Sequence, residues 1–140
     1  MEQFISDSLP GNNNLTEDMV HKLATFSREL HIASQRFNLT GLKTLEEVTD
    51  HLIVGSIRPL FELDVPRGTS LLDIGTGSGV PGIPVSIALN SIKSVLIDSN
   101  SRKIEFINSF IASSGLMNIQ ALSVRAEDTE NTLFESFDLV

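Results

Sequence analysis

Short apolar runs recur along the second half of the chain, and helical patterns separate them. Four runs have the length and composition of buried strands: residues 70–74, 94–98, 120–124 and 137–140. Between the second and the third, isoleucine and phenylalanine recur on one face of a helix predicted over residues 101–113. We expect Ser101 to cap this helix and Gly115 to end it, and a shorter helix over residues 84–88. Strands and helices that alternate in this way predict an α/β fold with a parallel sheet.

The first part of the chain is predicted to be helical. Thr16 should cap a helix whose apolar stripe contains Met19, Val20, Leu23, Phe26, Ser27 and Leu30. Residues 38–41 interrupt the pattern, and Thr44 should cap a second helix over residues 45–60. The run Pro66-Arg67-Gly68 is typical of a linker. The sequence therefore predicts an N-terminal helical cap over residues 1–65 and a sheet domain over residues 66–140 that contains four strands.

Composition restricts the classes of function. The chain has 140 residues, a formal net charge of −8 and no cysteine, so a disulfide framework and a thiolate metal site are excluded, and no metal site is predicted. No apolar run reaches the ~20 residues that span a membrane, and residues 1–14 do not read as a signal peptide. We therefore expect a cytoplasmic protein with no membrane partner. The negative charge argues against a nucleic-acid partner unless basic residues such as Arg36, Lys43, Arg102 and Lys103 gather locally.

The most informative residues are the glycines at positions 75, 77 and 79, directly after the first predicted strand. Glycine allows positive φ there and lets a ligand approach the backbone. Asp98 ends the second strand about 20 residues further on, where nucleotide-binding α/β folds place the acid that binds ribose hydroxyls. Because the spacing is Gly-x-Gly-x-Gly, without the dinucleotide pattern, it favours S-adenosylmethionine over NAD. Taken singly, the glycines could form an ordinary turn, Asp98 could cap a helix, and Glu127 could be a solvated first-turn acid.

Several segments together resemble one family. They are Asp73–Pro84, Ile97-Asp98-Ser99 with Arg102-Lys103, Arg125-Ala126-Glu127, and Arg36–Thr40. From about Thr16 to Val140, the chain is similar to the ribosomal RNA small subunit methyltransferase G family, also called glucose-inhibited division protein B. The resemblance implies a Rossmann-like S-adenosylmethionine-dependent methyltransferase fold. It also implies methylation of guanine N7 in 16S rRNA, with the small ribosomal subunit as partner.

The same resemblance implies cofactor contacts at Gly75, Val80, Ala126 and Glu127, with Asp98 as the ribose acid and Gly77 in the same turn. For Asp73 it implies a role through backbone support or a bridging water molecule. No catalytic residue is predicted. Guanine N7 carries an exposed lone pair, so the enzyme need only align it with the sulfonium methyl group. Pyrimidine C5 methylation, by contrast, normally needs a cysteine nucleophile, which the chain lacks.

Two departures from the family pattern modify these expectations. His51 is followed by Leu-Ile-Val-Gly, where the family has x-x-Asp-Ser. The chain stops at Val140, where the family continues with a cofactor-site arginine and three further strands. We therefore expect a sheet that is incomplete at the C-terminus, an exposed edge that favours self-association, and little activity from these residues alone. A methyltransferase with another substrate and a non-catalytic chain that binds only cofactor or a partner are the alternatives, and the sequence predicts no oligomeric state.

Overall fold

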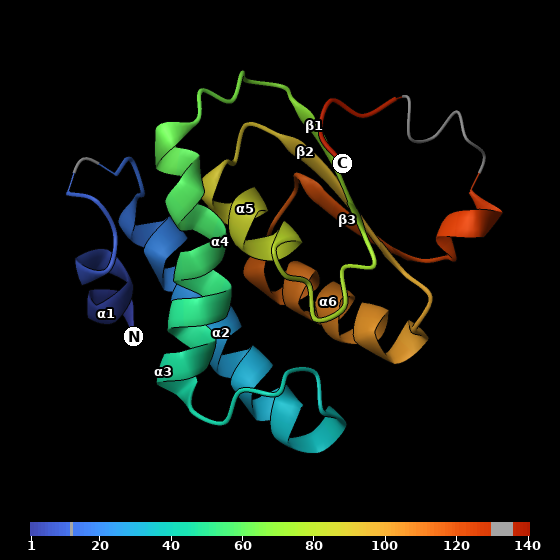
Figure 1. Ribbon diagram of the computed structural model, residues 1–140, viewed down its shortest axis with the longest axis horizontal. Helices are drawn as coiled ribbons and strands as arrows, with labels where there is room; N and C mark the ends of the chain where they lie inside the picture. The colour runs from blue at the N-terminus through green and yellow to red at the C-terminus, as the bar shows by residue number, and fades with distance from the viewer. Residues whose placement is uncertain (12, 130–135) are drawn as a thin grey trace. The chain divides into compact units, whose positions relative to one another are not determined.

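The computed structural model describes residues 1–11, 13–129 and 136–140 (Figure 1). The chain divides into two compact units, Met1–Asp64 and Val65–Val140. The first unit is built from helices, and the second from a parallel sheet with helices. Among the described residues, no helix is long and apolar enough to cross a membrane.

The first unit consists of helices joined by short loops. α1 (Glu2–Asp7) and α2 (Glu17–Phe37) precede a helical segment made of α3 (Leu45–Glu47), the π-helix η1 (Val48–Val54), α4 (Gly55–Ile57) and the 3-10 helix η2 (Arg58–Glu62). The predicted cap of α2 is confirmed, since Thr16 Oγ1 accepts a hydrogen bond from the Met19 backbone N–H at 3.2 Å. The predicted second helix is also present, but a π-helical stretch widens its middle.

The apolar stripe of α2 contributes much of the core of this unit. The buried apolar residues among those described in this unit are Ile5, Leu9, Leu23, Ala24, Phe26, Leu30, Ala33, Val48, Ile53, Val54 and Ile57. Ser27 and Thr49 are also fully buried, and their hydroxyl oxygens lie 2.6 Å apart in a hydrogen bond. The Thr49 hydroxyl also donates to the Leu45 carbonyl at 2.7 Å, so both buried hydroxyls have partners inside the core.

A capping box begins α3. Thr44 Oγ1 accepts from the Glu47 N–H at 3.1 Å, and Glu47 Oε2 accepts from the N–H groups of Thr44 and Lys43 at 3.0 and 2.9 Å. These backbone hydrogen bonds, that of Thr44 first, hold the pKa of Glu47 below its ordinary value of 4.5. A carboxyl with a lowered folded-state pKa stabilises the fold above the ordinary value, and that contribution is lost as the pH falls through the lowered one.

We therefore expect acid to weaken the first unit partly through Glu47. Glu47→Gln keeps an oxygen acceptor but does not titrate. The difference in unfolding free energy between wild type and variant should favour the wild type at about pH 7 and shrink toward about pH 3. Chemical denaturation at both pH values measures it, with Glu46→Gln as the control for loss of the same charge from the same turn. A difference that does not depend on pH would contradict the prediction.

Three parallel strands form the sheet of the second unit. They are β1 (Ser70–Ile74), β2 (Lys93–Asp98) and β3 (Ile119–Ser123), in the order β1-β2-β3. α5 (Gly82–Ala88) joins β1 to β2, and α6 (Ser101–Ser114) joins β2 to β3. Right-handed crossovers that advance in one direction place both helices on the same face of a sheet. Gly79 lies against Ile83 of α5 and Ile107 of α6, as this arrangement requires. The predicted α/β fold with a parallel sheet is confirmed.

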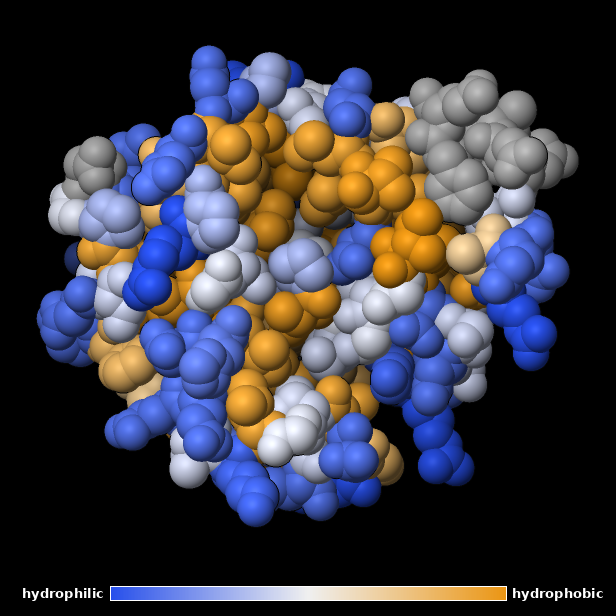
Figure 2. Space-filling view, in the orientation of Figure 1, coloured by the Kyte–Doolittle hydropathy of each residue, from blue (hydrophilic) through white to orange (hydrophobic). Residues whose placement is uncertain are grey.

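The other face of the sheet carries apolar side chains that are partly exposed. Ile74, Ile97 and Leu122 are in register across the three strands, one position beyond Asp73 and therefore on the opposite face from it. Ile74 is 40% exposed and Leu122 is 38% exposed, whereas Ile97 between them is buried. Figure 2 shows apolar surface over β1 and the end of the chain. Contiguous apolar surface is typical of a face that binds a ligand or another element.

The N-cap of α6 differs from the prediction by one residue. Asn100 Oδ1 accepts from the backbone N–H groups of Arg102 and Lys103 at 3.1 and 3.3 Å, so Asn100 is the cap. The expectation that Ser101 caps the helix is therefore wrong, and Ser101 is its first residue. The predicted end is confirmed, because Gly115 follows the helix with φ +69°.

The predicted strand over residues 137–140 is present only as a single parallel bridge between Leu139 and Leu71. The Leu72 N–H donates to the Leu139 carbonyl at 2.9 Å, and the Leu139 N–H donates to the Ser70 carbonyl at 3.0 Å. The side chain of Asp138 accepts from the Ser70 N–H at 2.7 Å. A side chain thus takes a backbone donor that a longer ladder would use, and a continuous fourth strand does not form among residues 136–140.

Candidate functional site

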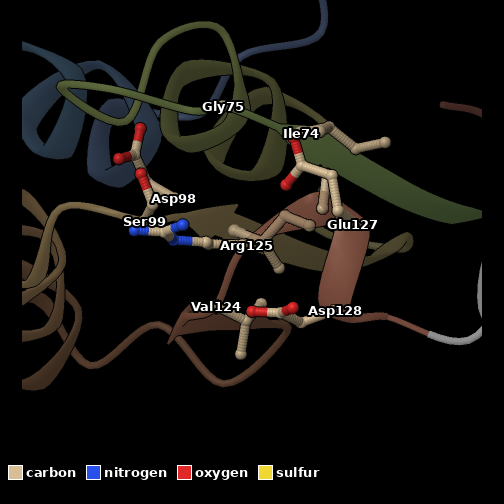
Figure 3. Close-up of a pocket in the computed structure, with 10 residues that line it drawn as sticks. Ile74, Gly75, Asp98, Ser99, Val124, Arg125, Glu127 and Asp128 are labelled. Carbon is tan, nitrogen blue, oxygen red and sulfur yellow. The ribbon is translucent and has the colours of Figure 1, made fainter.

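A pocket of about 470 Å³ opens at the carboxyl ends of the three strands (Figure 3). Residues 74–75 line it at the end of β1, residues 97–99 at the end of β2, and residues 124–128 after β3. All of them belong to the second unit. The volume lies within the ~300–1,000 Å³ typical of small-molecule sites. Open α/β sheets bind their ligands at this edge.

The loop after β1 carries three glycines with different surroundings. Gly75, Gly77 and Gly79 have φ values of +68°, +60° and +89°, which side chains rarely adopt. A Cβ at Gly75 would meet no atom within 4 Å, whereas one at Gly79 would lie 2.8 Å from Ile83 Cδ1 and 3.2 Å from Ile107 Cγ1. A side chain at position 79 would therefore press against Ile83 and Ile107 under the loop, in addition to the strain of its positive φ. The space beside Gly75, which lines the pocket, is open.

Asp98 connects the glycine loop to the end of β2. Its Oδ2 accepts a hydrogen bond from the Gly77 N–H, and its Oδ1 accepts one from the Asn100 N–H, both at 2.8 Å. Because Asn100 caps α6, the interpretation of Asp98 as a helix N-cap is wrong. A carboxylate oxygen can accept more than one hydrogen bond. Asp98 is thus fixed by two backbone donors and still offers acceptors to the pocket that it lines.

The segment after β3 forms another wall of the pocket. The Val124 N–H donates to the Asp98 carbonyl at 3.1 Å, which holds the segment to β2. The 3-10 helix η3 (Ala126–Asp128) follows, with Glu127 exposed in its first turn. The side chain of Arg125 extends toward Asp98 (Figure 3). Charged groups therefore surround a pocket whose inner wall includes apolar residues of β1 and β2.

Asp73, in β1, lies on the helix side of the sheet. Its Oδ2 accepts hydrogen bonds from Thr76 Oγ1 at 2.7 Å and from the Gly82 N–H at 3.0 Å. The pKa of the Asp73 carboxyl is raised above its ordinary value, chiefly because the carboxyl is buried. The hydrogen bonds from Thr76 and Gly82 oppose this shift, and the charge of Asp98 adds to it. Asp73 is not among the described residues that line the pocket.

The structure brings part of the predicted cofactor set together. Gly75, Asp98, Ala126 and Glu127 all line the pocket. Gly77 contacts Asp98 through its N–H, just outside the lining. Val80 is half-buried at the end of the loop and is not among the described lining residues. Cofactor contact by these residues stays a prediction.

Three polar residues of the pocket were not predicted as contacts: Ser99, Arg125 and Asp128. The sequence signal that could have identified them is their place after a strand, because the carboxyl ends of parallel strands meet at one edge. Arg102 and Lys103, expected near the mouth of the site, lie in the first turn of α6 and outside the described lining. Within residues 1–11, 13–129 and 136–140, no group of three or more acidic or histidine side chains could hold a metal ion.

Comparison with protein families and curated proteins gives consistent matches. A model of the family described as rRNA small subunit methyltransferase G (GidB) matches residues 19–140. The ribosomal RNA small subunit methyltransferase G of Mycoplasmoides gallisepticum is 36% identical over 132 residues, which cover 91% of this chain and 54% of that protein. The protein of the same name from Lactobacillus helveticus is 34% identical over 143 residues, covering 99% of this chain and 60% of that protein. The chain spans about half the length of the curated relatives it matches.

Solved structures agree on the fold. A crystal structure of coclaurine N-methyltransferase bound to N-methylheliamine and SAH matches with a TM-score of 0.51 and 13% identity, covering 92% of this chain and 47% of that one. At this identity the likeness shows the fold alone, which is the α/β Rossmann-like fold of S-adenosylmethionine-dependent methyltransferases. Because the family model matches most of its length, the chain belongs to the rRNA small subunit methyltransferase G (GidB) family.

Proposed function

We propose that this chain forms the cofactor-binding part of an enzyme that transfers a methyl group from S-adenosylmethionine to N7 of a guanine in 16S rRNA. The small ribosomal subunit would be its substrate. The observation that carries the proposal is the pocket at the carboxyl ends of the strands, lined by Gly75, Asp98, Ala126 and Glu127, in a chain of this family.

The residues of the pocket fit S-adenosylmethionine. The open space beside Gly75 lets the backbone approach the methionine part of the ligand. Val80, which lies outside the described lining, would pack beside that part from the end of the same loop. The Asp98 carboxylate, already oriented by the Gly77 and Asn100 N–H groups, can accept hydrogen bonds from the ribose hydroxyls. The segment over Ala126 and Glu127 would border the adenine.

This reaction mainly requires the protein to align guanine N7 with the methyl group of the cofactor. Bound S-adenosylmethionine supplies a methyl group on a positively charged sulfur. Guanine N7 has an unprotonated lone pair at neutral pH, so its attack needs no general base, and proximity and orientation carry most of the rate enhancement. Gly75 and Asp98 would fix the cofactor, and the apolar side chains of Ile74, Ile97 and Val124 would exclude water from one side of it.

Two experiments test the proposal in separate parts. Calorimetric titration with S-adenosylhomocysteine tests the cofactor site without RNA, and NAD binding of comparable affinity would contradict it. Transfer of a labelled methyl group to small ribosomal subunits tests the substrate, with large subunits as the control. The transfer assay uses this chain alone and this chain extended by the C-terminal segment of its Mycoplasmoides gallisepticum relative. Equal labelling of both subunits would contradict the proposed substrate.

Gly75→Ala should weaken S-adenosylhomocysteine binding about tenfold, because the added methyl group occupies space that the ligand needs. Gly115→Ala is the matched control: its φ of +69° equals that of Gly75 within a degree, and its Cβ would also meet no atom within 4 Å. Both substitutions should cost about 1–2 kcal/mol of stability through backbone strain. Calorimetry should show weaker S-adenosylhomocysteine binding in Gly75→Ala but not in Gly115→Ala. Equal affinities of the two variants would show that Gly75 does not face the ligand.

A further inference from the structure

The segment Val80-Pro81-Gly82-Ile83-Pro84 leads from the glycine loop into α5 and lies outside the described lining of the pocket. Gly82 is buried where this segment enters the helix. A Cβ there would lie 2.7 Å from Asp73 Oδ2 and 2.7 Å from Leu96 Cγ. Only a residue without a side chain lets the backbone come this close to Asp73.

Asp73 holds the glycine loop at two points, one near each end. The Thr76 hydroxyl at 2.7 Å and the Gly82 N–H at 3.0 Å both donate to the same oxygen, Oδ2. Asp73 is half-buried, so water competes little for these two hydrogen bonds. One carboxylate oxygen thus ties the beginning of the loop to its end.

Thr76 in turn organises the loop backbone. The residue is 2% exposed, and its N–H donates to the Ile97 carbonyl of β2 at 3.0 Å. Its carbonyl accepts from the Gly79 and Val80 N–H groups at 2.9 and 3.3 Å. If Asp73 releases the Thr76 side chain, the residue that joins the loop to β2 loses one of its anchors.

Asp73 and Asp98 bind different residues of the loop. Asp98 lines the pocket and accepts from the Gly77 N–H, whereas Asp73 lies outside the described lining and accepts from the Thr76 hydroxyl and the Gly82 N–H. The loop that presents Gly75 to the pocket is consequently held by two carboxylates.

We infer that Asp73 is a positioning residue for cofactor binding, which acts through Thr76 and Gly82 on the loop that presents Gly75 and does not touch the ligand. The inference rests on the proposed function, since it presupposes that the pocket binds S-adenosylmethionine. The role requires an oxygen acceptor at Oδ2. It does not require a negative charge close to the cofactor.

Titration with S-adenosylhomocysteine distinguishes a requirement for the oxygen acceptor from a requirement for the negative charge. Asp73→Ala removes the acceptor and should weaken binding about tenfold, whereas Asp73→Asn keeps an oxygen there and should bind within about threefold of the wild type.

Thr76→Val removes one of the two donors and should weaken binding about threefold or more, with Thr76→Ser as its matched control. The Thr76 pair keeps the inference testable if Asp73→Ala does not fold. Amide hydrogen exchange over residues 75–82 should rise in Asp73→Ala and stay low in Asp73→Asn.

Each outcome has a definite reading. Wild-type affinity in both Asp73→Ala and Thr76→Val would overturn the inference. Equal losses in Asp73→Asn and Asp73→Ala would also overturn it, because the charge rather than the acceptor would then matter. Failure of the wild type itself to bind S-adenosylhomocysteine would instead overturn the proposed function.

Discussion

Gly82→Ala should lower the free energy of unfolding by about 2–4 kcal/mol, through an overpacked contact and a weakened hydrogen bond to a charged acceptor. The new Cβ would lie 2.7 Å from Asp73 Oδ2 and 2.7 and 2.8 Å from Leu96 Cγ and Cδ2. Leu96 is fully buried in the central strand, so it has little room to move aside. Asp73 can move only by breaking its hydrogen bonds to Thr76 and Gly82.

Gly41→Ala is the control for this substitution. A Cβ at Gly41 meets no atom within 4 Å, and the residue does not have a positive φ. Its stability should therefore stay within about 1 kcal/mol of the wild type. Chemical denaturation with equal m-values compares the two variants. If Gly82→Ala loses no more unfolding free energy than Gly41→Ala, the structure around Gly82 accommodates the added methyl group without overpacking.

The sheet could be predicted because its strands are short apolar runs closed by turn residues. β1 is observed at the predicted residues, Ser70–Ile74, and β2 and β3 each begin one residue earlier than predicted. Backbone hydrogen bonds decide such ends, and an apolar pattern does not specify them to the residue. The π-helical stretch Val48–Val54 could not be predicted, because a short apolar stripe looks much the same in an α- and a π-helical turn.

Neighbouring residues of similar chemistry also limit prediction. Asn100 and Ser101 are both good N-cap residues, and only the extended backbone of Asn100, with φ −86° and ψ 104°, makes it the cap. The strand predicted over residues 137–140 has a suitable composition, but the side chain of Asp138 competes for the Ser70 N–H that a longer ladder would use.

The candidate site was most directly predictable where a residue's place at the end of a strand determines its position. Gly75 and Asp98 stand at the ends of successive parallel strands, so the topology alone brings them to one edge. The sequence left open whether Asp73 supports the backbone or acts through a water molecule. Its hydrogen bonds to Thr76 and Gly82 favour support, and they depend on a loop geometry that sequence spacing does not encode.

Asp98→Ala should weaken S-adenosylhomocysteine binding by about 1.5–3 kcal/mol, or roughly 10- to 150-fold, if the carboxylate accepts hydrogen bonds from both ribose hydroxyls. The substitution also removes the acceptor of the Gly77 and Asn100 N–H groups, so some stability should be lost with it. Calorimetry measures the first effect and denaturation measures the second. The ligand effect must therefore be separated from the loss of a loop anchor.

Asp138→Ala is the matched control for Asp98→Ala. Asp138 accepts two hydrogen bonds from Ser70, through its N–H and hydroxyl at 2.7 and 2.8 Å, at the opposite end of β1 from the pocket. Both variants lose one carboxylate and two hydrogen bonds, but only Asp98→Ala should bind the ligand less tightly. An analogue of S-adenosylhomocysteine without ribose hydroxyls should bind the wild type and Asp98→Ala about equally, since the group that Asp98 recognises is missing. If the analogue still binds the wild type more tightly by the full amount, Asp98 acts only as an anchor of the loop at Gly77, and its assignment to the ribose is wrong.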